Sequence, residues 1–449
     1  MTEIAAPAPP PMAPPAPVAP GERIVALDVV RGLAVLGILV MNIVEFGLPM
    51  QAYGDPRAAG GSAGADLWTF HVQQALFDGR MRGLFSMLFG AGMVLIAERM
   101  ERNGRGGEAA DLLLRRCLWL VPFGIAHRFL LQWTGDILYM YGLFGVLAVA
   151  FRTLRPRALI AAGLLLLAMQ VPIEVFHHHN AAEQRAVAAE AVLVEQNGGT
   201  PTDEQQRARA GWERRAKAPG DNAAELAAIR GGWTSSFAHR WNHNHTFQSA
   251  YLYYIFVWDV LGMILLGMGL GRRGFFAGAM RTRTYALLVG GGLAAAAASW
   301  WITADLAAHD FARTELERHF VQRATYPFLR LLGALGWAAL LILVLRRGAL
   351  RAVTGTLAAV GQLAFSNYVL QTVCCTVLFF GFGFGWYGDL SRAELMLVVA
   401  AVSAVQIAFS LLWLRRFRFG PLEWAWRSLT YWRRQPFRRA PDPAGTTAA

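Results

Sequence analysis

The sequence comprises 449 residues, of which 55% are hydrophobic and only 16% are charged. Soluble globular domains carry about 25% charged residues, so this composition excludes an ordinary soluble enzyme or binding domain. The formal net charge of +12 does not indicate nucleic acid as a partner, because the arginines fall in short clusters between apolar runs and form no continuous basic face. The lipid bilayer is therefore the expected partner.

Residues 1–22 are rich in Pro and Ala and cannot bury a core, so we expect a disordered tail there. The first apolar run begins near Ala26 and is about 20 residues long, enough to cross a hydrocarbon core of roughly 30 Å. This run is too long for a cleaved signal peptide and predicts a signal anchor that stays in the membrane.

Apolar runs of similar length recur along most of the chain and predict an all-α, polytopic integral membrane protein of about ten transmembrane helices. An N-terminal membrane region at 23–173 and a C-terminal membrane region at 250–418 each carry five of them. The expected spans are 26–46, 78–97, 113–131, 136–151, 157–173, 250–270, 284–303, 327–345, 356–380 and 393–413.

Arginine clusters separate the expected spans, and with ten crossings all of them fall on one side of the membrane. The positive-inside rule assigns that side to the cytoplasm, together with both termini. Arginines of these clusters include Arg99, Arg102, Arg105, Arg115, Arg116, Arg152, Arg155, Arg157, Arg272, Arg273, Arg281, Arg283, Arg346, Arg347, Arg351, Arg415, Arg416 and Arg418.

Two segments are expected to lie outside the hydrocarbon. Residues 419–449 interleave tryptophan with arginine, which predicts a cytoplasmic interfacial helix followed by a tail. Residues 174–249 form an external segment of mixed charge. Histidines stand near both ends of the external segment, but nothing in the sequence fixes the distance between the two groups, so no metal site is predicted. They are His177, His178, His179, His239, His243 and His245.

Asp28 and Arg31 are three residues apart at the point where the first helix enters the bilayer. Such a pair can neutralise itself and cap the helix at the interface. Alternatively, Arg31 binds a phosphate or carboxylate from the cytoplasm while Asp28 orients its guanidinium group. The sequence leaves both interpretations open.

Three amides lie deep in apolar runs. Asn42 is about three turns beyond Arg31 on the same helix, and Asn367 and Gln371 share one face of a later helix. An intramembrane amide either joins helices or lines a polar cavity. Asn367 and Gln371 either pair with each other or face a polar interior shared with Asn42, and we favour the shared interior.

The segment from His127 to Asp136 predicts a short outer turn that brings an imidazole close to a carboxylate. A carboxylate that holds a histidine raises its basicity, as a general base for an acceptor hydroxyl would need. An ordinary water-facing turn is the alternative. His71 has the same two interpretations and no partner evident in the sequence.

Several stretches together resemble one bacterial family. They include the opening Leu27-Asp28-x-x-Arg31-Gly32, the segment Arg82-Gly-Leu-Phe-Ser-Met-Leu-Phe-Gly90, and the closing Phe417-Arg-Phe-Gly-Pro-Leu-Glu-Trp-x-Trp-Arg427. These motifs resemble the YeiB-like family, whose C-terminal half is catalogued as domain of unknown function 418. The resemblance covers most of the chain after residue 22 and implies a bacterial inner-membrane protein of largely unassigned function.

The opening helix is also similar to that of the wider transmembrane acyltransferase superfamily. That similarity implies transfer of an acyl group from a cytoplasmic donor, such as acyl-coenzyme A, to an envelope glycan or lipid. Arg31 and Asp28 would face the donor and His127 or His71 would activate the acceptor, with no tightly bound cofactor. The sequence departs from the acetyltransferases in having no histidine between Asn42 and His71.

A transporter or exporter of a small metabolite is the alternative function, because intramembrane polar residues and about ten helices fit a substrate path equally well. A structural membrane protein that binds a partner is the third. The sequence does not predict the substrate or the oligomeric state.

Overall fold

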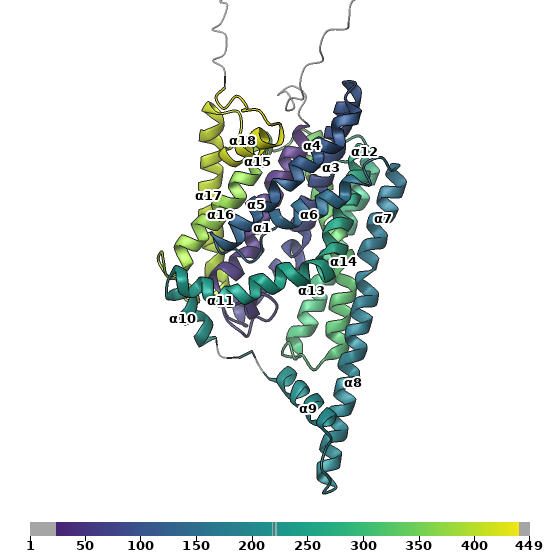
Figure 1. Cartoon of the computed structure of the whole chain (residues 1–449), viewed down its shortest axis with the longest axis vertical. Helices are drawn as coiled ribbons and strands as arrows, with labels where there is room; N and C mark the ends of the chain where they lie inside the picture. Colours follow the sequence, from purple (N-terminus) through teal and green to yellow (C-terminus); the bar gives the residue numbers. More distant parts are fainter. Residues whose placement is uncertain (1–23, 218, 221, 440–449) are drawn as a thin grey trace, which may run out of the picture.

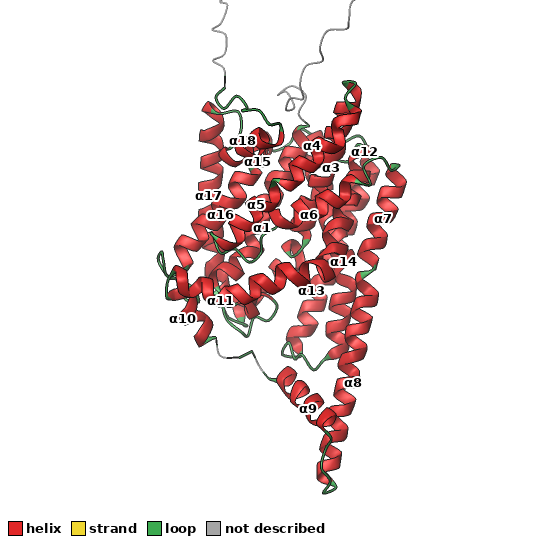
Figure 2. Ribbon diagram, viewed as in Figure 1, coloured by secondary structure: helices red, strands yellow, loops and turns green. Residues whose placement is uncertain are grey.

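A computed structural model describes residues 24–439 except 218 and 221, so the tail expected at 1–22 lies outside the described residues. The described residues form a bundle of helices with no strand (Figure 1, Figure 2). The predicted all-α membrane fold is confirmed. The α-helices are α1 (Val25–Gly47), α2 (Gly64–Val72), α3 (Arg80–Arg102), α4 (Ala109–Leu118), α5 (Leu120–Phe129), α6 (Leu138–Val149), α7 (Pro156–Ala168), α8 (Gln170–Gln196), α9 (Asp203–Ala216), α10 (Ala223–Arg230), α11 (Trp233–Thr246), α12 (Gly262–Arg272), α13 (Thr282–Ala308), α14 (Leu316–Arg346), α15 (Arg351–Gln362), α16 (Ala364–Phe379), α17 (Arg392–Arg416) and α18 (Pro421–Thr430).

Four segments are not α-helical: the 3₁₀ turns η2 (Met50–Tyr53) and η4 (Gly106–Glu108), and the π-helical segments η3 (Gln73–Phe77) and η5 (Phe247–Leu261). The π-helical segments join helices into longer ones, so that α2 runs through η3 to α3 and α11 runs through η5 to α12. Buried apolar side chains of α1, α3, α4, α6, α12 and α16 form much of the largest core cluster.

Seven helical stretches among the described residues are long and apolar enough to cross a membrane, and the bent pair α15 and α16 raises the number to eight. The expected number of ten was wrong because 113–131 and 136–151 are not among these stretches. The first is divided into α4 and α5, and the second is α6, which has only 12 residues. A helix of that length spans about 18 Å, well short of the roughly 30 Å of a hydrocarbon core.

Helices α5 and α6 instead form a hairpin joined by residues 130–137, and residues 132–137 at its tip lie inside the bundle. We expected an outer turn that faces water, but Gln132, Trp133 and Asp136 are completely buried. Gln132 Nε2 donates to the carbonyl oxygen of Trp233 on α11 (2.9 Å), and the Trp133 ring stacks on Phe46 of α1 with centroids 3.9 Å apart. The hairpin is therefore re-entrant.

The two ends of the bundle differ. We call the end where α1 begins and α18 lies the terminal end, at the top of Figure 1, and the opposite end, beyond which α9 lies, the distal end. Helices α3, α12, α14 and α17 all finish at the terminal end, so the arginine clusters that follow them lie there. The hairpin enters and leaves from this end, and a change from ten crossings to eight therefore leaves the sides of the other loops unaltered.

The segment 174–249 has two parts. Helix α8 continues α7 and extends with α9 beyond the distal end (Figure 1). Helices α10 and α11 instead pack against the bundle, where Arg230 Nε donates to the carbonyl oxygen of Tyr387 (2.7 Å) and Ser236 Oγ donates to Gln132 Oε1 (2.7 Å).

A buried carboxylate holds the break between α15 and α16, which are bent by 83°. Glu423 of α18 accepts hydrogen bonds from the backbone N–H groups of Phe365 (2.7 Å) and Ser366 (3.1 Å), and from the hydroxyl of Ser366 (2.5 Å). These N–H groups belong to the first turn of α16 and have no partner within the helix. Glu423 thereby caps α16 from a separate helix.

We predict that Glu423→Ala lowers the free energy of unfolding by about 1–3 kcal/mol, because buried N–H groups lose their acceptor. Glu423→Gln should cost less, since its amide oxygen can still accept. Thermal or denaturant unfolding in detergent measures both, and equal stability of the two variants would contradict the capping role.

The pH dependence of stability gives a second test. Burial raises the pKa of Glu423, although its hydrogen bonds oppose the shift. The folded state therefore binds the proton more tightly than the unfolded state, so the stability contributed by protonated Glu423 is full below the unfolded pKa of about 4.3 and is lost as pH rises through the folded pKa. Glu423→Gln should remove this loss from the pH profile.

A labelling experiment tests the number of crossings. In a background where Cys117, Cys374 and Cys375 are changed to Ser, His179→Cys and Arg347→Cys should react with a membrane-impermeant thiol reagent from opposite faces. Gln132→Cys should react from neither face, because residue 132 is completely buried. A chain with ten crossings would instead label position 132 from the same face as position 179.

Candidate central cavity

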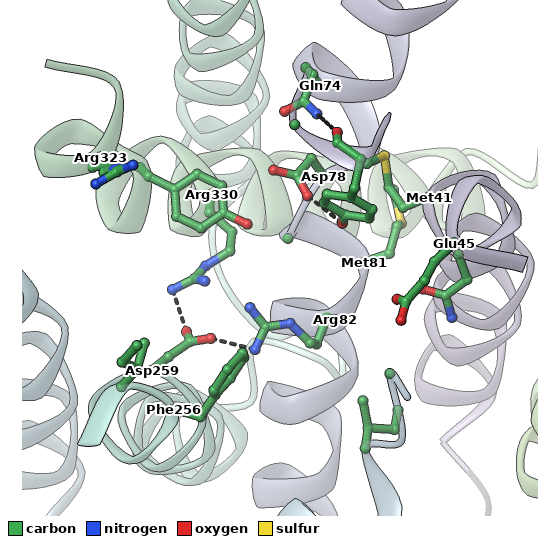
Figure 3. Close-up of a pocket in the computed structure, with 18 of the residues that line it drawn as sticks. Met41, Glu45, Gln74, Asp78, Met81, Arg82, Phe256, Asp259, Arg323 and Arg330 are labelled. Atoms are coloured by element: carbon green, nitrogen blue, oxygen red, sulfur yellow. Dashed lines mark hydrogen bonds and ion pairs between the residues drawn. The ribbon is translucent and has the colours of Figure 1, made fainter. Parts of the chain in front are cut away.

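A cavity of about 710 Å³ lies between the helices, lined by residues of α1, η2, α3, α6, α8, η5 and α14 (Figure 3). Ile38, Arg82 and Met140 line one part of the cavity. Glu174 of α8 and Arg323 of α14 line another part. The lining mixes apolar side chains with carboxylates, arginines and amides, which is the composition of a small-molecule site.

Two arginines share one carboxylate in the cavity wall. Arg82 Nη1 lies 2.5 Å from Asp259 Oδ2, and Arg330 Nη2 contacts Asp259 Oδ1 (Figure 3). The guanidinium groups also stack over aromatic rings, Arg82 over Phe256 at 5.2 Å and Arg330 over Tyr326 at 4.9 Å. We call Arg82, Asp259 and Arg330 the arginine–aspartate cluster. It joins α3, η5 and α14 at one point.

Further polar groups line other parts of the cavity. Asp78 Oδ1 accepts a hydrogen bond from the Tyr53 hydroxyl (2.8 Å). Glu45 accepts one from the Thr134 hydroxyl, and its carboxylate faces the cavity across from the arginines (Figure 3). Asn42, one turn before Glu45 on α1, also lines the cavity. The predicted intramembrane Asn42 thus lies at a polar cavity.

His127 and Asp136 do meet, but inside the hairpin tip. His127 Nδ1 lies 2.8 Å from Asp136 Oδ1, and its Nε2 lies 2.8 Å from the Thr372 hydroxyl of α16. Asp136 also accepts from the backbone N–H groups of Leu138 (3.2 Å) and Tyr139 (2.9 Å), so it caps α6. Both ring nitrogens of His127 are occupied and only 2% of its side chain is exposed, so this conformation gives an acceptor no access to it.

The other predicted donor-binding and catalytic residues lie away from the central cavity. Asp28 and Arg31 form an ion pair at the terminal end (3.0 Å), where Arg31 keeps 29% of its side chain exposed. His71 is buried between α2 and α13, with Nδ1 2.9 Å from the Thr303 hydroxyl. None of these three residues lines the central cavity.

Asn367 and Gln371 join three helices. Asn367 Nδ2 donates to Ser410 Oγ (2.8 Å), and Gln371 Nε2 donates to the carbonyl oxygen of Val35 (2.8 Å) and to Gln406 Oε1 (3.1 Å). These bonds connect α16 to α17 and α1. Asn367 and Gln371 are not among the residues that line the cavity with Asn42.

Three of the six histidines of the segment 174–249 line one or both of two cavities. His177 and His243 border the central cavity, and His177 and His178 line a second cavity of about 450 Å³ between α8, α9 and α14 with His319, Arg215 and Arg323. Burial and the neighbouring charge of Arg323 lower the pKa of Arg215. No group of three His, Cys, Asp or Glu side chains within the described ranges is placed to hold a metal ion.

Sequence comparison places the chain among proteins of unknown function. Residues 270–433 match the family described as "Protein of unknown function (DUF418)". The chain is 30% identical over 441 residues to the uncharacterized protein YxaH of Bacillus subtilis (strain 168), covering 93% of this chain and 96% of that protein. It is 30% identical over 429 residues to the uncharacterized protein YeiB of Escherichia coli (strain K12), covering 91% and 96%. The chain belongs to the YeiB-like family. No solved structure matches it.

Membership of the YeiB-like family confirms the resemblance seen in the opening, central and closing motifs, and the structure gives several motif residues a physical role. Arg82 contributes to the arginine–aspartate cluster, and Glu423 caps α16. The relatives YxaH and YeiB are themselves uncharacterized, so the chemistry of the site follows from its geometry alone.

We predict that His127 and Asp136 stabilise the fold as a coupled pair. His127→Ala leaves the fully buried Asp136 carboxylate without its side-chain partner and should lower the free energy of unfolding by about 2 kcal/mol. His245→Ala, on exposed α11 surface, is the control and should have no effect. In a double-mutant cycle, His127→Ala and Asp136→Ala should be non-additive by about 1 kcal/mol or more. Full stability of His127→Ala would show that the hairpin tip does not depend on this contact.

Proposed function

We propose that the chain is an acyltransferase-like protein of the bacterial inner membrane, which moves an acyl group from a cytoplasmic donor to an envelope glycan or lipid. The observation that best supports this proposal is the central cavity, a space lined by apolar and charged side chains and large enough for a small-molecule headgroup within a membrane-spanning bundle. In this proposal the terminal end faces the cytoplasm, as the arginine clusters require.

A basic cluster at the terminal end suits a donor that carries phosphates, such as acyl-coenzyme A. Arg31 lies near Arg116, and Arg116 in turn lies near Arg427, so that the three charges act on one another. Arg116 also stacks on the Trp426 ring at 3.7 Å. Guanidinium groups bind phosphate through paired N–H donors, and Asp28 holds the Arg31 group in place.

The acceptor would enter the central cavity from the distal end, where a carboxylate can take the proton of its hydroxyl group. Glu45 and Asp78 both line the cavity, and Glu45 is the better candidate for this general base because it is half-buried whereas Asp78 is buried. His127 acts in this scheme only through the hairpin tip that positions Thr134 and hence Glu45.

Transport of a small metabolite is the second candidate, and the broken helices favour it. The bent pair α15 and α16 and the π-helical segments η3 and η5 interrupt spans of the bundle. Discontinuous helices in membrane proteins commonly border substrate paths, and π-helical segments are frequent at functional sites.

Acyl transfer and transport can be separated with purified protein in proteoliposomes. Labelled acetyl-coenzyme A supplied at the terminal face should label a glycan or lipid at the other face, and Glu45→Gln should reduce the rate at least 100-fold, within the contribution typical of general-base catalysis. Uptake of a solute without any use of the thioester, unaffected by Glu45→Gln, would favour the transporter.

Donor binding gives an independent prediction. Arg31→Lys keeps the charge but loses the paired N–H donors, so affinity for the coenzyme A thioester should fall roughly tenfold while the protein still folds. Arg347→Lys, exposed at the same end, is the matched control and should bind as wild type. A different result would show that the pair is only an interfacial ion pair. In that case Arg31→Lys lowers the amount of folded protein without changing donor affinity, and exchanging Asp28 and Arg31 for each other restores the amount.

A further inference from the structure

The charged side chains around the cavity form groups that differ in net charge. At the hairpin tip, Arg128, Arg240 and Glu225 act on Glu45, and Arg128 also lies near Asp136, which gives two positive and three negative charges. At the cavity mouth, Arg323 lies 3.8 Å from Glu174, and 56% of the Arg323 side chain is exposed. Its charge is therefore not held away from water.

The arginine–aspartate cluster is not balanced. Asp259 is the carboxylate that both Arg82 and Arg330 contact, so one positive charge is left over. The nearby Asp78 does not compensate it, because Arg80 lies beside Asp78 and binds its carbonyl oxygen (3.3 Å), with further bonds to Gln74 O and Ser299 Oγ. An excess charge held away from water is costly unless a counter-charge approaches it.

Arg330 also has unused hydrogen-bonding capacity. Only 2% of the side chain is exposed, and its Nε has no hydrogen-bond partner among the described residues. Arg330 lines the cavity, and Figure 3 shows its guanidinium group directed to the same space as that of Arg82. Buried N–H groups normally have an acceptor, so an unpaired one at a cavity wall indicates a site for an acceptor from outside the chain.

The apolar part of the lining indicates what accompanies the anion. Ile38, Met41 and Phe77 border the inner space, and Ile255 of η5 borders the cavity on the side where Tyr254 is exposed on the bundle surface. An apolar chain can occupy this lining while its headgroup lies at the arginines.

We propose that the central cavity binds a phosphate-bearing ligand, whose phosphate oxygens accept hydrogen bonds from Arg82 and Arg330. A phosphate offers several terminal oxygens and can bridge two guanidinium groups, which suits it better than a neutral headgroup. The inference deepens the proposed function, since the acceptor would then be a phospholipid or a glycan phosphate, and binding alone tests it.

The test uses purified full-length protein and three probes. Dioctanoyl phosphatidic acid carries phosphate and chains, sn-glycerol 3-phosphate carries the phosphate alone, and dioctanoylglycerol carries the chains alone. We expect phosphatidic acid to bind at least tenfold more tightly than dioctanoylglycerol, as measured by titration calorimetry or by the concentration dependence of Tm. Equal binding of phosphatidic acid and glycerol phosphate would identify a headgroup site, and preference for phosphatidic acid a lipid site. Equal binding of the charged and neutral lipids would overturn the proposal.

Two variants that should change the affinity in opposite directions separate an effect on binding from an effect on folding. Arg330→Gln should weaken phosphatidic acid binding roughly tenfold or more, a loss of about 1.4 kcal/mol per factor of ten. Asp259→Asn removes the competing carboxylate and should tighten binding. Arg347→Gln, which removes an exposed charge directly after α14, should leave it unchanged. If Arg330→Gln does not fold, Asp259→Asn and Arg82→Lys decide, the latter by a loss of affinity.

Unchanged affinity in Arg330→Gln, or weaker affinity in Asp259→Asn, would also overturn the phosphate site. These readouts are separate from acyl transfer. Phosphate binding without any acyl transfer would refute the proposed function alone, and transfer to a neutral acceptor that does not depend on Arg330 would refute the phosphate site alone.

Discussion

Burial of charged side chains in a membrane-spanning bundle is the constraint on which the rest of the structure depends. A charge inside hydrocarbon must meet an opposite charge or several dipoles, and this chain satisfies its arginines by connecting distant segments. Arg392 of α17 is completely buried, contacts the carbonyl oxygen of Ala52 and donates to Gln73 Oε1 (2.8 Å). Arg80 reaches Ser299 of α13 (2.7 Å). Each arginine therefore fixes the position of a loop or a π-helical segment that apolar packing alone would leave undefined.

The same constraint explains which parts of the fold the sequence could predict. Apolar length identified the long spans, and the arginine clusters identified one end of the bundle, since these signals are local. The hairpin was mistaken for two crossings because its residues are apolar enough on average. Its polar tip found partners on α1, α11 and α16, and a sequence does not show such contacts between distant helices. The tip looked like a water-facing turn for the same reason.

The candidate site was predictable only in part. Asn42 was identified because a polar residue in an apolar run is conspicuous, and Asp259 and Arg330 carry the same signal inside expected spans. Their meeting with Arg82 depends on how α3, η5 and α14 pack, which the sequence does not specify. His127 shows the opposite case: its proximity to Asp136 follows from a short turn, but its lack of access to the cavity follows from Thr372, which is 245 residues away in the chain.

Glycines allow two pairs of helices beside the cavity to pack closely. A Cβ on Gly361 of α15 would collide with the carbonyl oxygen of Asp28, and one on Gly267 of α12 would collide with that of Met87 on α3. Backbones that approach this closely pack as rigid pairs, so α1 with α15 and α3 with α12 form fixed walls. The cavity lies where these walls meet α8, η5 and α14. The arginine–aspartate cluster joins η5 and α14 to the fixed helix α3. An anion that binds Arg82 and Arg330 would compete with Asp259 for them, so that ligand binding would weaken the contact that joins η5 to α3 and α14.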